Sequence, residues 1–392
     1  MELRFEAYRP RRLVNVHRRV DPWFWDRYSA FPYIGCRSGC TFCYLRGSRY
    51  ARFIDPDRFD THIRVKLGAP ELLKKELSRL EPDVIHAGDW QQPAESRYRL
   101  SRKMLEVVLE LGFPLLIIER SPLLTRDLDL LVEIRRRSWV FVLISISSLD
   151  PALKRAFEPK SPGLSRRLAL MEALAEKGIP VGLALMPVFP YLSDDPASLA
   201  ALIRAARDHG ASVVLAGTLT MDGPQAVRTL EALRQYRPDL EERWRDLYRW
   251  HGARPAYAPP RGYAARLGRQ VWEIAEREGL KDRLPRYVPP GPKARNRKLA
   301  EYLHLKAYRL DLEEAPGFRA QAYHRAAWTL DDLERDVAAI HREKGEAGLM
   351  ALPGFGPAIA AEAARWLKAH RWAPPTQSSQ VSPRPAKKAS SP

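Results

Sequence analysis

Cysteine is scarce in this chain: it occurs three times in 392 residues, and all three copies lie between positions 36 and 43. This odd number excludes a framework of paired disulfides, because one thiol would be left over. Long apolar runs are also missing, and none approaches the roughly 18 residues of a membrane span. The first residues, Met-Glu-Leu-Arg-Phe-Glu, lack the apolar segment of a secretory signal. We therefore expect a cytoplasmic protein with no membrane partner.

Acidic residues are fewer than basic ones, 47 against 65, which gives a net charge of +18. Such a charge attracts polyanions. Charge alone does not separate a nucleic-acid-binding surface from a basic surface that is merely solvated. The length suits two or three domains, and a hydrophobic content of 45% is ample for a core.

The three cysteines, Cys36, Cys40 and Cys43, are four and then three positions apart. A closed mononuclear zinc site needs four protein ligands, whereas three thiolates suit an iron-sulfur cluster that keeps one iron free. This spacing, with an aromatic residue before the last cysteine, resembles the radical SAM superfamily. The resemblance implies that the cysteines bind a 4Fe-4S cluster whose fourth iron binds S-adenosylmethionine.

Beyond the cysteine loop, short apolar runs alternate with amphipathic stretches up to about residue 220. This alternation predicts parallel strands covered by helices. With residues 31–34 as the first strand, the pattern contains six βα units, fewer than the eight of a closed barrel. The expected fold class is therefore α/β, a partial (β/α)6 TIM-like barrel. The other predicted strands are 83–87, 114–118, 139–146, 180–186 and 211–216, and the predicted helices are 70–80, 98–111, 126–136, 165–177 and 197–209.

Parallel βα architecture places chemistry at the carboxyl ends of the strands. Polar or glycine residues follow each predicted strand, in phase with the cysteine loop. We therefore expect the residues at these strand ends to form one site.

The chain divides by composition into five expected segments. Residues 1–29 form an arm rich in arginine and aromatic residues, and 30–223 form the barrel. Residues 224–312 form a helical extension that packs on the barrel, 313–372 form a second, all-α domain, and the low-complexity tail 373–392 is predicted to be disordered.

The stretch from Leu352 to Ala360 reads as a glycine turn between two helices, with Pro357 at the first position of the second helix. It resembles a helix-hairpin-helix motif, and together with the helix before it resembles the N-terminal domain of family X DNA polymerases. The resemblance implies that backbone N–H groups of Gly354, Phe355 and Gly356 bind a DNA phosphate without reading sequence. The lysine that forms a Schiff base in lyase-competent members is replaced by Glu362, so lyase chemistry is not expected.

Within the radical SAM superfamily, residues of about 30–220 resemble the branch that contains spore photoproduct lyase. The resemblance rests on the cysteine loop, Gly88-Asp89, the segment from Ser121 to Leu131, and Ser145-Ile-Ser-Ser-Leu-Asp150. It implies cofactor-binding roles for Phe42, which would pack near the adenine, and for Gly88, Asp89, Arg120 and Ser145. Arg120 replaces a lysine that contacts the methionine carboxylate, and its fork can bind a carboxylate with two hydrogen bonds.

One departure from this branch concerns the hydrogen-atom donor. The branch has an additional cysteine near the end of the second strand, where this chain has His86. Tyr44 is the candidate catalytic residue for a radical relay, with packing as its alternative role. Repair of that branch's thymine lesion is therefore not a firm expectation.

The leading hypothesis is a lyase-like radical SAM enzyme that repairs or modifies double-stranded DNA through a 5′-deoxyadenosyl radical. Its electron donor would be a flavodoxin-like or ferredoxin-like protein. Structured RNA such as tRNA is the alternative substrate. A redox sensor that binds nucleic acid and catalyses nothing is the alternative from another functional class.

Overall fold

The computed structural model describes residues 2–50 and 53–370. Its centre is a seven-stranded sheet of order β10-β9-β8-β7-β6-β3-β2. In this sheet β3, β6, β7, β8, β9 and β10 run parallel to their neighbours, and β2 (Val14–Val16) pairs antiparallel with β3 at one edge. The predicted partial parallel barrel is therefore confirmed. The parallel strands are β3 (Tyr28–Ala30), β6 (Ile85–Gly88), β7 (Leu115–Glu119), β8 (Val140–Ser145), β9 (Val181–Val188) and β10 (Val214–Thr218).

The prediction of residues 31–34 as the first barrel strand is wrong. The first parallel strand is β3, and Tyr33–Ile34 forms β4, which pairs antiparallel with β5 (His62–Lys66). These two strands and β1 (Arg4–Tyr8) make a separate three-stranded sheet. Pro32 lies between β3 and β4, and proline cannot donate a ladder hydrogen bond inside a strand.

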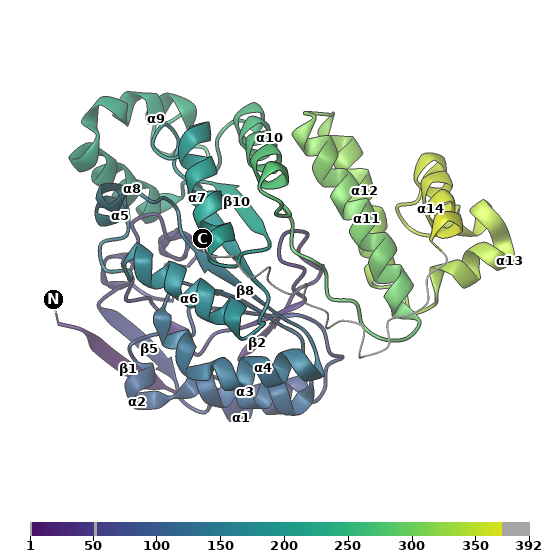
Figure 1. Cartoon of the computed structure of the whole chain (residues 1–392), viewed down its shortest axis with the longest axis horizontal. Helices are drawn as coiled ribbons and strands as arrows, with labels where there is room; N and C mark the ends of the chain where they lie inside the picture. Colours follow the sequence, from purple (N-terminus) through teal and green to yellow (C-terminus); the bar gives the residue numbers. More distant parts are fainter. Residues whose placement is uncertain (1, 51–52, 371–392) are drawn as a thin grey trace, which may run out of the picture.

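Helices cover the outer face of the large sheet (Figure 1). Their apolar sides pack on strand residues such as Ile85, Leu115 and Leu183, all fully buried. Burying one such side chain stabilises the fold by about 1.5–3 kcal/mol. These helices are α1 (Ala69–Leu77), α3 (Leu100–Leu111), α4 (Leu128–Arg137), α6 (Leu164–Glu176) and α7 (Pro196–Asp208), close to the predicted spans.

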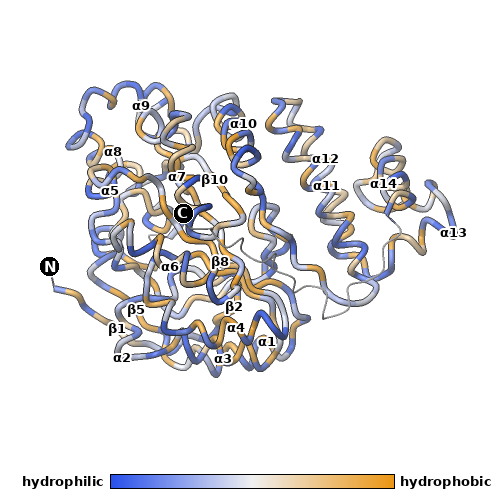
Figure 2. Tube along the Cα trace, in the orientation of Figure 1, coloured by the Kyte–Doolittle hydropathy of each residue, from blue (hydrophilic) through white to orange (hydrophobic). Residues whose placement is uncertain are grey.

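A second apolar cluster, which includes Leu116, Phe141 and Leu215, covers part of the inner face of the sheet. Trp25 of the N-terminal arm inserts into this cluster and donates from Nε1 to the carbonyl of Leu284, at 3.0 Å. The central strands form the most hydrophobic part of the trace (Figure 2). Residues that precede the barrel in the sequence and residues that follow it therefore both pack on its inner face.

From residue 223 onward the described chain is mainly helical. It contains α8 (Gly223–Tyr236), α9 (Glu241–Leu247), α10 (Arg261–Arg277), α11 (Lys293–Leu312), α12 (Gly317–Asp331), α13 (Val337–Met350) and α14 (Pro357–Ala369). The expected boundary at residue 313 falls between α11 and α12. One apolar cluster joins Leu303 of α11 to Leu330 of α12 and Ala363 of α14, so the core spans that boundary. The predicted disordered tail, 373–392, lies outside the described residues.

Shorter elements complete the chain. They are the short helix α2 (Glu95–Tyr98), α5 (Pro151–Phe157), and the 3-10 turns η1 (Tyr44–Arg46), η2 (Pro56–Arg58), η3 (Pro122–Asp127) and η4 (Pro238–Leu240). Among the described residues, no helix combines the length and the apolar content that a membrane span requires.

Candidate functional site

The cysteine loop follows β4 and is shaped by two glycines in the left-handed region. Gly35 has φ +92°, and a Cβ there would lie 2.8 Å from the carbonyl oxygens of both Phe59 and His62. Gly39 has φ +65°. Only glycine fits such a position without strain. Cys36 and Cys40 are buried, and Cys43 is half-buried.

Backbone hydrogen bonds fix this loop to segments that are distant in sequence. The Cys36 N–H donates to the carbonyl of Phe59, and the Thr41 N–H donates to the carbonyl of Phe157, both at 2.9 Å. Two side chains of α8 bond the loop's carbonyls: Thr229 Oγ1 donates to Thr41 at 3.1 Å, and Gln225 Nε2 donates to Phe42 at 3.3 Å. The loop is therefore held from several sides.

Arg120, at the end of β7, links the cysteine loop to the end of β8. Its Nη1 lies 2.7 Å from Cys40 Sγ, and its Nη2 lies 3.3 Å from Ser145 Oγ. Glu158 Oε2 is 3.8 Å from Arg120 and also pairs with the buried Arg167, which donates to the Ser145 carbonyl at 3.0 Å. The structure thus brings together the predicted residues Arg120, Ser145 and Cys40.

Gly88 is the last residue of β6, and Asp89 follows it beside the same loop. Asp89 Oδ1 is 3.6 Å from Cys36 Sγ, and Asp89 has φ +54°, a left-handed conformation rare outside glycine. The predicted strand-end residues on β6, β7 and β8 therefore lie along one edge of the sheet, against the cysteines.

Glu119 is a buried residue of this site to which the sequence assigned no role. Its carboxylate accepts hydrogen bonds from the backbone N–H groups of Gln91, Arg120 and Ser121, at 2.8–3.1 Å. Burial, and then the nearby Asp89, raise the pKa of Glu119 to about 7. These hydrogen bonds stabilise the turn after β7 and so fix the position of the Arg120 backbone. The sequence feature that could have indicated this role is an acidic residue at the end of an otherwise apolar strand.

The two aromatic residues of the loop have different surroundings. Phe42 is buried and packs edge-on against Phe189, with ring centroids 5.2 Å apart. Tyr44 is about half exposed (52%), and its ring meets Tyr50 at 5.7 Å. The adenine contact of Phe42 and the radical relay of Tyr44 stay predictions.

The second predicted motif, the glycine turn, lies between α13 and α14. Gly354 has φ +81°, Gly356 caps the start of α14, and Pro357 is the first residue of that helix, as predicted. A Cβ at Gly356 would meet nothing within 4 Å. Phe355 is buried, and its N–H donates to the carbonyl of Leu352. Of the predicted residues Gly354, Phe355 and Gly356, only Gly356 has no described neighbour close to its Cβ position.

Glu362 of α14 is engaged within the helical domain, by which we mean the four packed helices α11 to α14. Its carboxylate accepts hydrogen bonds from the hydroxyls of Tyr302 and Tyr323, both at 2.6 Å. This carboxylate ties α11 and α12 to α14. A structural role therefore accounts for the residue at the position where lyase-competent proteins would have lysine.

Family profiles match both motif-bearing parts of the chain. Residues 31–203 match the Radical SAM superfamily, and residues 294–372 match a helix-hairpin-helix domain. The chain belongs to the radical SAM superfamily. Both resemblances seen in the sequence are thereby confirmed at the level of family.

Similar proteins support this assignment. A protein of Mycobacterium tuberculosis, described as uncharacterised, is 32% identical over 240 residues, which are 60% of this radical SAM protein and 69% of the relative. An uncharacterised protein of Methanocaldococcus jannaschii is 27% identical over 168 residues, 43% of this chain and 62% of the relative. A spore photoproduct lyase mutant with bound AdoMet and dinucleoside spore photoproduct has a TM-score of 0.53 at 16% identity, covering 71% of this chain and 81% of its own. That likeness concerns the fold.

The donor set of this radical SAM protein fits the cluster that its family implies. No three His, Cys, Asp or Glu side chains in the described part of the chain converge on a single metal ion. Ligands of different irons in a cluster do not need to converge in that way. Burial raises the pKa of Cys40 to about 12, although Arg120 opposes the shift, and burial and Asp89 raise the pKa of Cys43 to about 12. Cluster binding must therefore displace the thiol protons.

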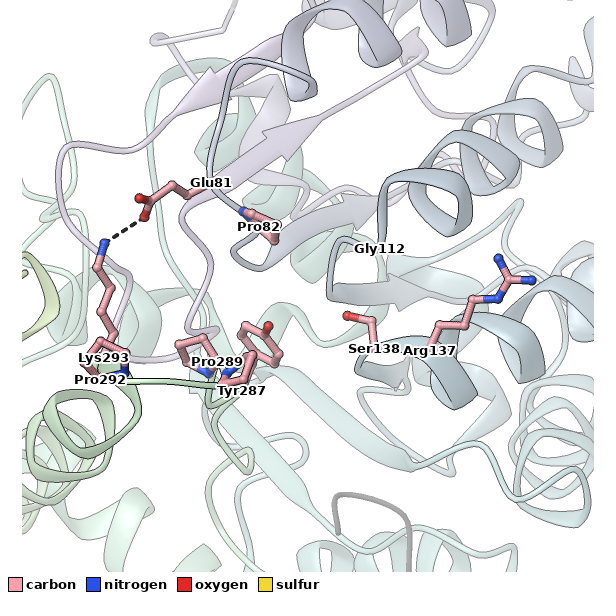
Figure 3. A pocket seen from close by; sticks show the side chains of 10 residues that line it. Glu81, Pro82, Gly112, Arg137, Ser138, Tyr287, Pro289, Pro292 and Lys293 are labelled. Atoms are coloured by element: carbon pink, nitrogen blue, oxygen red, sulfur yellow. Dashed lines mark hydrogen bonds and ion pairs between the residues drawn. The ribbon is translucent and has the colours of Figure 1, made fainter. Parts of the chain in front are cut away.

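A cavity of about 490 Å³ lies elsewhere on this radical SAM protein (Figure 3). It is lined by residues that precede β6, β7 and β8, including Pro82, Gly112 and Ser138, and by the proline-rich joint before α11. At its rim, Lys293 Nζ donates a hydrogen bond to Glu81 Oε2 at 2.8 Å. The cavity is at the amino ends of the strands, opposite the cysteine loop, so it is separate from the candidate site.

Proposed function

We propose that this radical SAM enzyme acts on nucleic acid, with double-stranded DNA as the first candidate for repair or modification. The observation that carries the enzymatic part of the proposal is the contact of Arg120 with both Cys40 and Ser145 at the carboxyl edge of the sheet. It sets a fixed cation beside the thiols, in a chain that also has a helix-hairpin-helix domain.

The residues of the site would divide the work of holding the cofactors. Cys36, Cys40 and Cys43 would bind the 4Fe-4S cluster, and Gly88, Asp89, Arg120 and Ser145 would surround S-adenosylmethionine. Glu158 and Ser145 hold the Arg120 guanidinium in place, so it offers a preorganised fork to a carboxylate. When bound, the cluster and S-adenosylmethionine would supply the 5′-deoxyadenosyl radical chemistry of the family.

The helical domain would bind the backbone of the nucleic acid. Its glycine turn opens at the N-terminus of α14, where helix N–H groups favour phosphate. In Figure 1, α13 and α14 lie at the opposite end of the long axis from α8, which holds the cysteine loop. A nucleic acid bound at the turn must therefore extend along the molecule to reach the cysteines. A target base inside a duplex must also be flipped out of its stack.

Anaerobic reconstitution tests the enzymatic part of the proposal. The chain is loaded with iron and sulfide, reduced with dithionite and given S-adenosylmethionine, and 5′-deoxyadenosine is measured by chromatography. Its formation supports the proposal, and its absence from a fully loaded protein would refute it. A flavodoxin-like or ferredoxin-like electron donor should then replace dithionite.

Competition between duplex DNA and tRNA tests the choice of substrate. Binding is measured at several salt concentrations, because phosphate contacts weaken as salt displaces them. A preference for the duplex supports DNA. A preference for tRNA would replace DNA by RNA as the substrate while leaving the radical chemistry in place.

A further inference from the structure

A polar cluster lies on the inner face of the sheet, near its β2 edge, and the proposed function does not use it. It consists of His17, Asp26, Ser29 and His86, referred to below as the histidine cluster. His86 pairs in register with Leu116, which belongs to the apolar cluster of the inner face. Because paired residues of neighbouring strands point to the same side, His86 also faces inward.

Asp26 joins the two imidazoles of the histidine cluster. Its Oδ2 lies 3.4 Å from Nδ1 of His17 and 3.4 Å from Nδ1 of His86. A carboxylate can only accept hydrogen bonds, so these two contacts favour the neutral tautomer in which Nδ1 carries the hydrogen and Nε2 is the acceptor. His17 Nε2 is 3.2 Å from Ser29 Oγ, whose hydroxyl can donate to it.

Within residues 2–50 and 53–370, two polar atoms of the histidine cluster have no hydrogen-bond partner. Asp26 is 2% exposed, and its Oδ1 accepts no hydrogen bond from this part of the chain. Within the described residues, no group is hydrogen-bonded to Nε2 of His86, whose side chain is 16% exposed. A buried polar atom such as Asp26 Oδ1 costs about 1–3 kcal/mol when it lacks a partner and marks a place where a ligand can supply the missing bond. The His86 ring is partly exposed, so a ligand can reach it.

The surroundings of His86 are aromatic, and a glycine, Gly88, stands beside its Nε2. A Cβ at Gly88 would lie 3.4 Å from His86 Nε2 and 3.7 Å from Phe31 Cε1, so the missing side chain leaves this nitrogen uncovered toward the strand end. Phe24 and Phe31 flank the imidazole, with ring centroids 5.3 and 6.3 Å away. Flat rings pack well between such side chains.

We propose that the histidine cluster is the substrate-ring site of this enzyme. His86 Nε2 accepts a hydrogen bond from an N–H group of a flat heteroaromatic ring, such as a nucleobase, held beside Phe24 and Phe31. Asp26 is a positioning residue that fixes the tautomer of His86. The inference rests on the proposed function and deepens it, because it names the part of the nucleic acid that enters the barrel.

The test is binding of short single-stranded oligonucleotides, one of each base, by the full chain without cofactor. An abasic strand of equal length is the reference, because it has the phosphates and lacks the rings. We expect at least one base to bind more tightly than the abasic strand. His86→Leu should lower that affinity about tenfold. His86→Gln should lower it less, because the glutamine side-chain carbonyl can still accept a hydrogen bond. The exposed His251→Leu is the matched control.

A second measurement uses the native protein, without a substitution at His86. In ¹⁵N-labelled protein, the Nε2 resonance of His86 should shift when the preferred oligonucleotide is added and stay in place with the abasic strand. Equal binding of all strands, or equal affinity of native and His86→Leu proteins, would overturn the inference. Failure of the proposed function looks different: 5′-deoxyadenosine would not form, while the dependence on His86 would persist.

Discussion

The cysteine loop and the glycine turn are both short motifs shaped by glycine, but they are held in different ways. The cysteine loop bonds to Phe59, Phe157 and α8, which are separated from it by up to 188 positions. The glycine turn is held mainly within the helical domain: Gly354 packs on the backbone of Arg325 and Ala326, and Thr329 Oγ1 donates to the Pro353 carbonyl at 2.8 Å. The first motif depends on the whole barrel, and the second depends on its own domain.

This difference implies that the two motifs can be disrupted separately. A change in the cysteine loop should abolish the radical chemistry and leave nucleic-acid binding intact. A change in the glycine turn should do the reverse. A change in the joint between the barrel and the helical domain should affect the stability of both.

The largest effect is expected from Cys36→Ala. Because no fourth cysteine exists in the chain, nothing can replace the lost thiolate. Iron retained after reconstitution and 5′-deoxyadenosine formation should both fall to background, while duplex affinity should stay at the native value. Undiminished 5′-deoxyadenosine formation in this variant would remove Cys36 from the cluster site.

Asp331→Ala should cause the largest loss of stability. Burial alone would raise the pKa of Asp331, but Arg286, His304 and Arg297 together outweigh this effect and lower the pKa to about 2. The carboxylate lies 2.5 Å from Arg286 and 3.7 Å from Arg297, which also pairs with Asp83 of the barrel. Removing it leaves the buried Arg286 without its carboxylate partner, so the free energy of unfolding in urea should fall by about 3–5 kcal/mol.

Asp332→Ala is the matched control, because Asp332 pairs with Arg27 but is 57% exposed. It should cost at most about 1 kcal/mol. Equal losses in the two variants would mean that the joint does not depend on the buried pair.

Gly354→Ala tests the glycine turn. A Cβ at this residue would lie 3.2 Å from the backbone of Arg325 and Ala326, and its positive φ costs a non-glycine residue about 1–2 kcal/mol. Duplex affinity should fall about tenfold, while cofactor cleavage stays unchanged. Gly252→Ala is the control, because a Cβ there meets nothing within 4 Å. Native affinity in Gly354→Ala would place the nucleic-acid contact elsewhere.

The smallest effect is a pH dependence confined to the helical domain. Burial and the neighbouring His304 lower the pKa of His324 from 6.5 to about 4. Between these values the unfolded chain binds more protons than the folded chain at this residue, so its contribution is complete above pH 6.5 and is lost as the pH falls toward 4. Asp331 and Arg286 also face His304. We expect about 1 kcal/mol less stability at pH 5 than at pH 7, allowing for partial exposure.

Fluorescence of Trp328, which stacks on His324 with a centroid distance of 5.6 Å, can report this transition. The dependence should weaken in His324→Gln and persist in the exposed control His251→Gln. An unchanged pH profile in His324→Gln would assign the effect to another group.

The sequence predicted the barrel because its buried parallel strands are nearly continuous apolar runs, and it predicted the glycine turn because that geometry is local. It misplaced the first strand, because Ser29 interrupts the apolar pattern of β3. It also did not assign roles to Glu119 or to Gln225 and Thr229, which support the site through backbone contacts. Such contacts depend on how distant segments meet, which no local spacing records.

The N-terminal arm adds a consequence for the order in which the protein is built. Trp25 bonds to Leu284, and Val20 accepts from Trp328, 259 and 308 positions later in the chain. Because the arm is synthesised first, the hydrogen bond of Trp25 can form only after most of the chain, including Leu284, has been synthesised. A chain interrupted before Leu284 would leave an indole without its acceptor in the barrel interior, which makes stalled or truncated products natural clients for chaperones.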